Sequence, residues 1–421
     1  MRKVADWQMS NFTYNASGSH DYGIAAWTHS TLYIGMLEWA KIAPNSNRCY
    51  DWLYDKGRKG NWTVASNFEN NSTYQFYHAD ELCVGQFHIG MYKKYREENM
   101  IASIKERVDR IIANPPTNQS MTSGNKKLWT WCDALFMAPP VYAELSQLLD
   151  DNVYRVYMDT QYKRTYNRLF DPEEKLFFRD DSYFNKKEAN GEKVFWGRGN
   201  GWAIAGTANI LKALPKDSEY KEYYEDVFRQ LALRLIELQN NDGSWHASLL
   251  DPDSYPAPET SASALITYAL AYGLNNNLLT EEEAYKPVAK AWNKLCDAIH
   301  ANGKLGYVQP VGQDPKTVTK DMTATFGVGA FLLAGTEIYH YLDSKTGIDL
   351  IEKEISSLEE FLSPETKIRI YTVQGQKVNE ELLSNRNFIT VLKEKNLPRG
   401  VYLINFQLNE KLKTINYIPS K

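Results

Sequence analysis

The sequence predicts an all-α (α/α)6 toroid followed by a small C-terminal β-sandwich domain. Strongly apolar helices alternate with single-striped helices up to about residue 345. The apolar helices begin at roughly regular intervals, and such a repeat of helical hairpins indicates a stacked or closed array. Beyond this point the pattern changes to the alternation typical of β-strands. We therefore expect a helical domain over 1–345, a linker over 346–365 and a β-sandwich over 366–421.

Six segments with helical periodicity are apolar on most of their faces. Small residues are frequent in them, as in the stretch 201–208. Helices of this kind are buried, as the inner ring of a toroid is. They span 22–43, 80–95, 133–149, 200–215, 259–275 and 325–342.

Six more polar helices lie between these segments, each with one apolar stripe. In one of them the stripe is formed by Val227, Leu231, Leu235 and Leu238. A single stripe predicts an outer helix that buries one face only. These helices span 1–10, 46–56, 100–113, 151–168, 218–240 and 282–301.

The loops before the inner helices are aromatic and resemble one another, as at 175–179, 242–246 and 303–307. An open α-solenoid is the structural alternative to a closed ring. The recurring aromatic loops favour the toroid, because a closed ring would gather them around one central funnel. Its inner helices would run parallel, so that their N-termini share one mouth.

The C-terminal segment contains three runs with β-type alternation, at 367–373, 388–392 and 401–406. Gly375 and the stretch 398–400 supply turns between them. We expect these runs to form a small antiparallel sandwich.

The composition argues against several classes of partner. The net charge is only -4 and no block of basic residues occurs, so we expect no nucleic acid and no anionic membrane surface. No apolar run approaches the length of a membrane span, so we expect no membrane insertion. Aromatic residues make up 13% of the chain, which favours carbohydrate, because aromatic faces stack on sugar rings. No pattern indicates the oligomeric state.

Neither a metal site nor a nucleotide site is indicated. The four cysteines are far apart and show no zinc-ligand spacing. Gly197, Gly199 and Gly201 have the wrong spacing for a dinucleotide-binding loop, and no strand precedes them.

Asp133 is the leading candidate for a catalytic group. It lies among Trp131, Phe136 and Met137 at the start of a predicted inner helix. Water is scarce in such a place, so Asp133 could keep a proton near neutral pH and deliver it to a substrate. The helix N-terminus favours the anion, but we expect desolvation to prevail. The alternative is that Asp133 only caps the helix.

Asp80 is a second carboxylate at the start of an inner helix. In a toroid it would face Asp133 across the mouth, and repulsion would make one of the two hold its proton more tightly. The polar neighbours His78 and Glu81 favour an ionised Asp80 that can orient water. A plain N-cap is the alternative.

Arg198 lies between Trp196 and Trp202 in sequence. An arginine held by stacking presents a rigid fork that suits a carboxylate, and the two indoles could flank a sugar ring. The alternative is that both tryptophans are core residues and that Arg198 pairs with a structural aspartate.

Other candidates lie on the loops. Arg179 would add a second positive contact, or would pair with Asp180 or Asp181. His246 follows an aromatic residue and is expected at the polar rim. Glu259 could line the mouth, with its neighbours serving as helix caps.

Several motifs occur in an order that resembles glycoside hydrolase family 105, the unsaturated rhamnogalacturonyl hydrolases. This family is related to the unsaturated glucuronyl hydrolases of family 88. The resemblance covers about residues 1–342. It rests on Ala-Asp-Glu at 79–81, Trp-x-Asp-x-Leu-Phe-Met-Ala-Pro-Pro at 131–140, Phe-Trp-Gly-Arg-Gly-Asn-Gly-Trp at 195–202, Asp-Gly-Ser-Trp at 242–245, Glu-Thr-Ser-Ala-Ser at 259–263 and Gly-Val-Gly-Ala-Phe-Leu-Leu-Ala at 327–334.

The resemblance implies an (α/α)6 barrel that removes the Δ4,5-unsaturated uronic acid left at the non-reducing end of oligosaccharides by polysaccharide lyases. Asp133 matches the acid that protonates C4 of the vinyl ether, and Asp80 matches the carboxylate that holds the sugar or the water. Trp196, Arg198 and Trp202 match residues around the uronate. The resemblance implies no metal and no organic cofactor.

One departure concerns the substrate. Rhamnogalacturonan-acting members of the family commonly have a histidine where this chain places Arg179. An arginine would suit a different sugar in the next subsite, or one that carries sulfate as in ulvan.

The C-terminal segment resembles the sorting domains of Bacteroidetes secretion substrates, through Ile370-Tyr371, the stretch 374–378 and the stretch 400–404. This resemblance implies a periplasmic or secreted protein, although no signal peptide is evident at the N-terminus.

Two other functions remain compatible with these residues. One is an inverting glycosidase that cleaves saturated sugars, with Asp133 as acid and Asp80 as base. The other is a non-enzymatic glycan-binding protein that uses the aromatic mouth.

Overall fold

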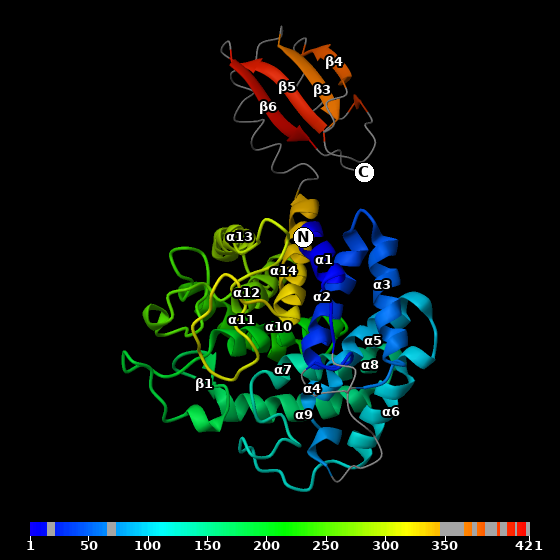
Figure 1. Cartoon of the computed structure of the whole chain (residues 1–421), viewed down its shortest axis with the longest axis vertical. Helices are drawn as coiled ribbons and strands as arrows, with labels where there is room; N and C mark the ends of the chain where they lie inside the picture. Colours follow the sequence, from blue (N-terminus) through cyan, green and yellow to red (C-terminus); the bar gives the residue numbers. More distant parts are fainter. Residues whose placement is uncertain are drawn as a thin grey trace. The chain divides into compact units, whose positions relative to one another are not determined.

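The computed structural model describes residues 1–14, 22–64, 73–345, 366–372, 377–383, 394–395, 402–408 and 411–417. The chain forms two compact units, Met1–Ile338 and Tyr339–Lys421. Figure 1 shows helices throughout the first unit and strands in the second. The predicted linker, 346–365, lies outside the described residues.

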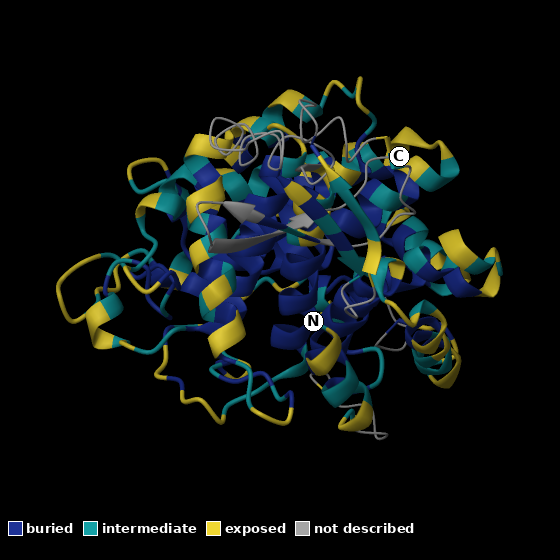
Figure 2. Ribbon diagram, turned by 90° about the horizontal axis from the view of Figure 1, so that it is seen from above, coloured by how far each residue is buried: buried dark blue, intermediate teal, exposed yellow. Residues whose placement is uncertain are grey.

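The first unit contains a ring of buried helices. They are α2 (Trp27–Ile42), α4 (Ala79–Leu82) with α5 (Val84–Tyr95), α7 (Ala134–Met137) with α8 (Pro139–Leu149), α10 (Gly197–Ala213), α12 (Thr260–Asn275) and α14 (Thr325–Lys345). Figure 2 shows that the buried residues are concentrated in these central helices. Their apolarity on most faces is therefore explained by neighbours on every side.

The ring is closed. Helices α2, α5, α8, α10 and α12 each pack against the next in this order. The Nδ2 of Asn275 in α12 donates to Oε2 of Glu337 in α14 at 2.8 Å. A Cβ on Gly35 of α2 would lie 2.1 Å from the carbonyl oxygen of Gly329 in α14, so these two backbones touch. The closed ring agrees with the predicted toroid and not with an open solenoid.

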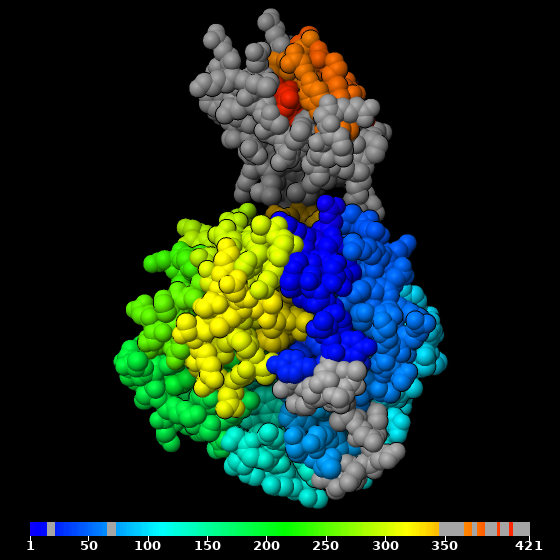
Figure 3. Space-filling view, in the orientation of Figure 1, coloured from blue at the N-terminus to red at the C-terminus, as the bar shows by residue number. Residues whose placement is uncertain are grey.

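Six outer helices surround the ring in the part of the chain that the structure describes. They are α1 (Arg2–Ser10), α3 (Ser46–Lys59), α6 (Asn99–Ala113), α9 (Asn152–Leu169), α11 (Lys221–Glu237) and α13 (Glu281–Asp297). Helices α3, α6, α9, α11 and α13 each pack on the inner helix before them in sequence. Helix α1 reaches α14, where the side chain of Met1 lies against Gly335. On the surface drawn in Figure 3, the N-terminal segment lies beside the yellow segment around residue 300, and Gly303 is in contact with Lys3.

Two inner helices differ from the prediction, because each is interrupted. Cys83 separates α4 from α5, and Ala138 separates α7 from α8. The second break has a clear cause. Pro139 and Pro140 begin α8, and proline has no N–H to continue the hydrogen-bond ladder of the preceding turn.

Short elements shape the loops at the starts of the inner helices. They are η1 (Tyr74–Phe76), the hairpin β1 (Phe170–Asp171) and β2 (Leu176–Phe177), η2 (Asp181–Tyr183) and η3 (Pro252–Ser254). The side chain of Asn200 in α10 holds the hairpin, since it accepts from N–H of Phe177 at 2.8 Å and donates to its carbonyl at 3.0 Å. This hairpin was not predicted, because two-residue strands leave too short a pattern.

The described residues of the second unit form a four-stranded antiparallel sheet in the order β4-β3-β5-β6. The strands are β3 (Lys367–Thr372), β4 (Lys377–Leu382), β5 (Tyr402–Leu408) and β6 (Lys411–Tyr417). Two of them match predicted runs, whereas β4 and β6 were missed. The predicted strand at 388–392 lies outside the described residues. The sheet agrees with a β domain, and its assembly into a sandwich stays a prediction.

Candidate active site

The starts of the inner helices meet at one end of the ring. The hydroxyl of Thr325, at the start of α14, donates to the carbonyl of Thr28 in α2 at 2.9 Å. Nη1 of Arg198 in α10 lies 3.4 Å from Oγ of Ser261 in α12. The rings of His78, before α4, and Trp131, before α7, stack at 4.7 Å. These contacts bring sequence-distant residues together at one end of the ring, as parallel inner helices require.

Asp133 precedes α7 and is 9% exposed. It occupies the N-cap position, but its side chain makes no capping hydrogen bond. Desolvation raises the pKa of Asp133 above its ordinary value, and the nearby Arg179 and Arg198 oppose this shift without reversing it. The Asp133 carboxyl group therefore does not act as a helix cap, and its surroundings favour the protonated form.

Arg179 is the cation beside Asp133. Its Nε lies 3.8 Å from Oδ2 of Asp133, and its Nη1 donates to Oδ2 of Asp180 at 2.5 Å. Burial would lower the pKa of Arg179, but Asp133 and Asp180 together raise it. The Nε–H is buried and has no hydrogen-bond partner among the described residues. Both expected roles are compatible with this geometry, since Arg179 pairs with Asp180 and still presents an N–H near Asp133.

Asp181 is occupied elsewhere. Its Oδ2 accepts from Nη2 of Arg168 at 3.2 Å, and its Oδ1 accepts from the N–H of Ser123 at 2.9 Å. Of the two aspartates considered as partners of Arg179, the structure therefore selects Asp180.

Arg198 is 1% exposed, and its fork is directed at a loop. Nη1 donates to the carbonyl of Gln309 at 2.5 Å, and Nη2 donates to that of Pro310 at 2.8 Å. Desolvation lowers the pKa of Arg198, opposed by Glu259 and Asp133. The guanidinium lies over the rings of Trp196 at 4.5 Å and Phe326 at 4.9 Å. The expected stacking thus exists, but Phe326 takes the place predicted for Trp202.

Trp196 and Trp202 lie in the core, each 1% exposed. The indole N–H of Trp196 donates to Oε1 of Gln309 at 3.3 Å. The ring of Trp202 packs against Phe136 at 4.7 Å and against Trp27 at 6.2 Å. Neither indole has an exposed face for a sugar, which corrects the expectation that the two would flank one.

Glu259 is fully buried, which corrects the expectation that it lines the mouth. Its carboxylate caps α12, accepting from N–H of Ser261 and of Ala262. It also accepts from N–H of Gln309 at 2.9 Å. Glu259 and Arg198 therefore hold the same loop from two sides.

Asp80 is the second residue of α4, so it is not the N-cap, a position that His78 occupies. Its carboxylate is partly exposed, and Oδ2 lies 3.8 Å from Nδ1 of His78. Helix α4 packs against α7, and His78 stacks on Trp131. The structure thus places Asp80 and Asp133 on neighbouring elements at the same end of the ring.

His246 lies on the loop beside the start of α10, where its carbonyl oxygen is 2.4 Å from the position of a Cβ on Gly197. Its Nδ1 is 3.1 Å from the carbonyl of Pro252. This half-buried position is compatible with a rim residue.

Sequence reasoning missed three residues of this region, namely Gln309, Phe326 and Tyr183. Burial and the charge of Asp314 raise the pKa of Tyr183 to about 12, with a further contribution from Asp133 and an opposing one from Arg179. Gln309 lies in a segment without a motif. Phe326 lies in the predicted inner helix 325–342, but nothing in that pattern indicates its contact with Arg198.

The described part of the chain contains no cluster of side chains suited to a metal ion. All four cysteines are free, and three of them are buried. None of the described helices is long and apolar enough to cross a membrane.

Comparison with known families gives two matches. The model of glycosyl hydrolase family 88 matches residues 1–342. The model of the secretion system C-terminal sorting domain matches residues 352–418.

Individual relatives agree with the first match. The chain is 35% identical to an unsaturated 3S-rhamnoglycuronyl hydrolase from Formosa agariphila, over 80% of this chain and 89% of the relative. It resembles the solved structure of a glycosyl hydrolase family 88 protein from Bacteroides vulgatus, with 29% identity, a TM-score of 0.72 and coverage of 81% and 97%. A family 105 structure from C. acetobutylicum has the same fold at 20% identity, with a TM-score of 0.62 and coverage of 80% and 99%.

Proposed function

Because the chain belongs to glycosyl hydrolase family 88, we propose that it removes a Δ4,5-unsaturated uronic acid from the non-reducing end of oligosaccharides that polysaccharide lyases release. The observation that carries this proposal is Asp133. It is a buried carboxyl with a raised pKa that makes no capping bond and lies beside a cation. Such a group can hold a proton and transfer it to carbon.

The reaction is a hydration. Asp133 gives its proton to C4 of the C4=C5 double bond, and the positive charge that develops at C5 is shared with the ring oxygen. Water adds to C5, and its extra proton is accepted by a carboxylate. The resulting hemiketal opens by breaking the bond from C5 to the ring oxygen. This leaves a ketone at C5 and a hemiacetal at C1, which expels the leaving sugar.

We assign the water-orienting role to Asp80. Its carboxylate is partly exposed and lies on α4, next to the element that carries Asp133. His78 lies 3.8 Å from the Asp80 carboxylate and stacks on Trp131, so both rings would shape the floor on which the sugar rests.

For the substrate carboxylate, we assign Arg179 as the main contact. The carboxylate is attached to C5, adjacent to the carbon that receives the proton. A cation 3.8 Å from Asp133 is therefore in the right place to align both groups. Arg198 is bound to two loop carbonyls, so we assign it to holding that loop and to raising the positive potential of the mouth. His246 would contact more distant parts of the oligosaccharide.

The leaving sugar is proposed to be rhamnose in an ulvan-type oligosaccharide. The supporting observations are the name of the 35% identical relative and the arginine at position 179. The sorting-domain match at 352–418 supports a secreted or periplasmic location. The linker over 346–365 and the β-sandwich over 366–421 stay proposals from the sequence, and the match overlaps both.

The test is the loss of ultraviolet absorbance of the conjugated uronate. Lyase digests of ulvan, rhamnogalacturonan and glycosaminoglycans would be compared, with saturated p-nitrophenyl glycosides as a further arm. We expect turnover of the ulvan digest, and a decrease on the order of 10²–10⁴-fold in Asp133→Asn, the range typical of a lost general acid. Asp109→Asn, on an outer helix, is the matched control and should keep full activity.

Two results would contradict the proposal. Turnover of saturated glycosides alone would indicate an ordinary glycosidase. Full activity of Asp133→Asn on the unsaturated substrate would remove Asp133 from the chemistry.

A further inference from the structure

The break between α7 and α8 leaves buried carbonyls without their usual partners. In a continuous helix the carbonyl of Phe136 would accept from the N–H of residue 140, but Pro140 has none. The carbonyl of Met137 would accept from Val141, whose N–H is bonded to Ala138 instead, at 3.0 Å. Because Phe136 and Met137 are buried, carbonyls left without donors here would be costly.

A side chain from another inner helix supplies the missing donor. Nε2 of Gln86 in α5 donates to the carbonyl of Phe136 at 2.8 Å and lies 3.5 Å from that of Met137. Carbonyls can only accept, so this contact determines which end of the amide faces α7. Gln86 itself is buried.

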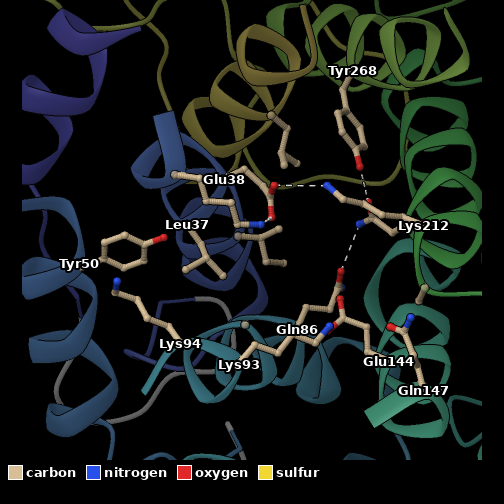
Figure 4. A pocket seen from close by; sticks show the side chains of 16 residues that line it. Leu37, Glu38, Tyr50, Gln86, Lys93, Lys94, Glu144, Gln147, Lys212 and Tyr268 are labelled. Atoms are coloured by element: carbon tan, nitrogen blue, oxygen red, sulfur yellow. Dashed lines mark hydrogen bonds and ion pairs between the residues drawn. The ribbon is translucent and has the colours of Figure 1, made fainter. Parts of the chain in front are cut away.

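The amide of Gln86 is held in turn by two further inner helices. Nδ2 of Asn209 in α10 donates to Oε1 of Gln86 at 3.2 Å, and the hydroxyl of Tyr268 in α12 donates to Oδ1 of Asn209 at 2.5 Å. Figure 4 shows this chain of bonds at the edge of a cavity of about 300 Å³. Apart from Tyr50 of α3, the lining residues of the cavity come from the inner helices, and Asp133, which precedes α7, is not among them.

The supported turn is the one that carries Asp133. The N–H of Phe136 donates to the carbonyl of Asp133 at 3.0 Å, so the two residues are joined through one helical turn. Helix α10 also contacts this turn closely, because a Cβ on Gly206 would lie 2.1 Å from the carbonyl oxygen of Leu135. Helix α7 has only four residues, so its direction depends on these outside contacts.

We propose that Gln86 is a positioning residue for the acid, which acts through the carbonyl of Phe136 and is oriented by Asn209 and Tyr268. It sets the direction of α7 and thereby how deeply the carboxyl group of Asp133 is buried. This inference rests on the proposed function, in which Asp133 is the proton donor.

The test is Gln86→Leu in the full-length chain, assayed on the unsaturated oligosaccharide over a range of pH. Leucine is preferred to alanine, because water from the adjacent cavity could enter an alanine site and serve the carbonyls. We expect kcat to fall on the order of tenfold with KM changed less than about twofold, since small misplacements of a reacting group mainly affect the chemical step. We also expect the alkaline limb of kcat/KM to move to lower pH, because a more hydrated Asp133 would lose its proton more easily.

The matched control is Gln147→Leu, which removes an exposed amide from the same cavity and should leave both readouts unchanged. Asn209→Leu is the second variant. It should shift the alkaline limb of kcat/KM in the same direction by a smaller amount, and it replaces Gln86→Leu if that variant does not fold. An unchanged kcat and pH profile in the folded Gln86→Leu protein, or in Asn209→Leu if Gln86→Leu does not fold, would overturn the proposal, even if thermal stability fell. Activity of Asp133→Asn, measured alongside, tests the proposed function separately.

Discussion

At the scale of single residues, the site depends on a balance at Asp133. Burial favours the neutral acid, while Arg179 and Arg198 favour the anion. Arg179 is itself shared with Asp180, which weakens its hold on Asp133. On balance the pKa of Asp133 is raised. The site therefore keeps a proton donor close to the cations that would bind a uronate.

This balance predicts a pH-dependent effect on stability. A carboxyl whose pKa rises above its ordinary value of 3.8 on folding stabilises the folded state in its protonated form. Its contribution is fully present below that value and is lost as the pH rises through the folded-state pKa. We therefore expect Asp133→Asn to match the wild type in Tm at low pH and to exceed it at neutral pH.

The check is thermal unfolding of both proteins between acidic and neutral pH. Asp6→Asn is the comparison, because Asp6 forms an exposed ion pair with Arg48, and it should show no such gain. A Tm difference for Asp133→Asn that stays constant over this range would contradict the balance described above.

At the scale of elements, close backbone contact holds the ring together. Gly35 of α2 and Gly329 of α14 meet without side chains between them, and this contact joins the first inner helix to the last. The proline break between α7 and α8 is a second device, because it leaves α7 as a four-residue piece that α5 and α10 position through contacts with Phe136 and Leu135. Small residues and prolines thus set the geometry of the mouth from within the helices.

Replacement of Gly35 by alanine tests the closure. The added Cβ would lie 2.1 Å from a backbone oxygen, so a helix must shift. We expect a loss of about 1–3 kcal/mol or more in the free energy of unfolding, as for other overpacked sites. Chemical denaturation measures it, with Gly124→Ala as the control, since a Cβ at Gly124 meets nothing within 4 Å. Equal stability of the two variants would show that the contact between α2 and α14 is not tight.

At the scale of the whole molecule, the candidate site and the sorting-type domain belong to different units. Every residue assigned to chemistry or binding lies within Met1–Ile338. The family 88 match ends at residue 342, and the sorting-domain match begins at residue 352. Catalysis and export are therefore expected to be separable.

A chain that ends at residue 345 tests this separation. We expect its kcat/KM on the unsaturated oligosaccharide to stay within about twofold of the full-length value, because no assigned residue is removed. Steady-state kinetics of the two purified proteins provide the comparison. A large loss of activity in a folded truncated protein would show that the second unit contributes to the site.

The sequence by itself determined the alternation of buried and half-buried helices and the change to β-type runs after about residue 345, and it indicated the candidates Asp133, Asp80 and Arg179. Hydrophobic periodicity is a local property of a helix and predicts which faces it can bury, and short motifs mark the starts of several inner helices. Only the tertiary structure decided that Trp196 and Trp202 are core residues, that Glu259 is a cap and that Phe326 stacks on Arg198. The guanidinium of Arg198 donates to the carbonyl of Gln309, and Gln86 donates to the carbonyl of Phe136. In both bonds the two partners lie far apart in the chain. The physical reason is that a side chain's role depends on which atoms meet it after the ring closes, and a linear pattern holds no information about those partners.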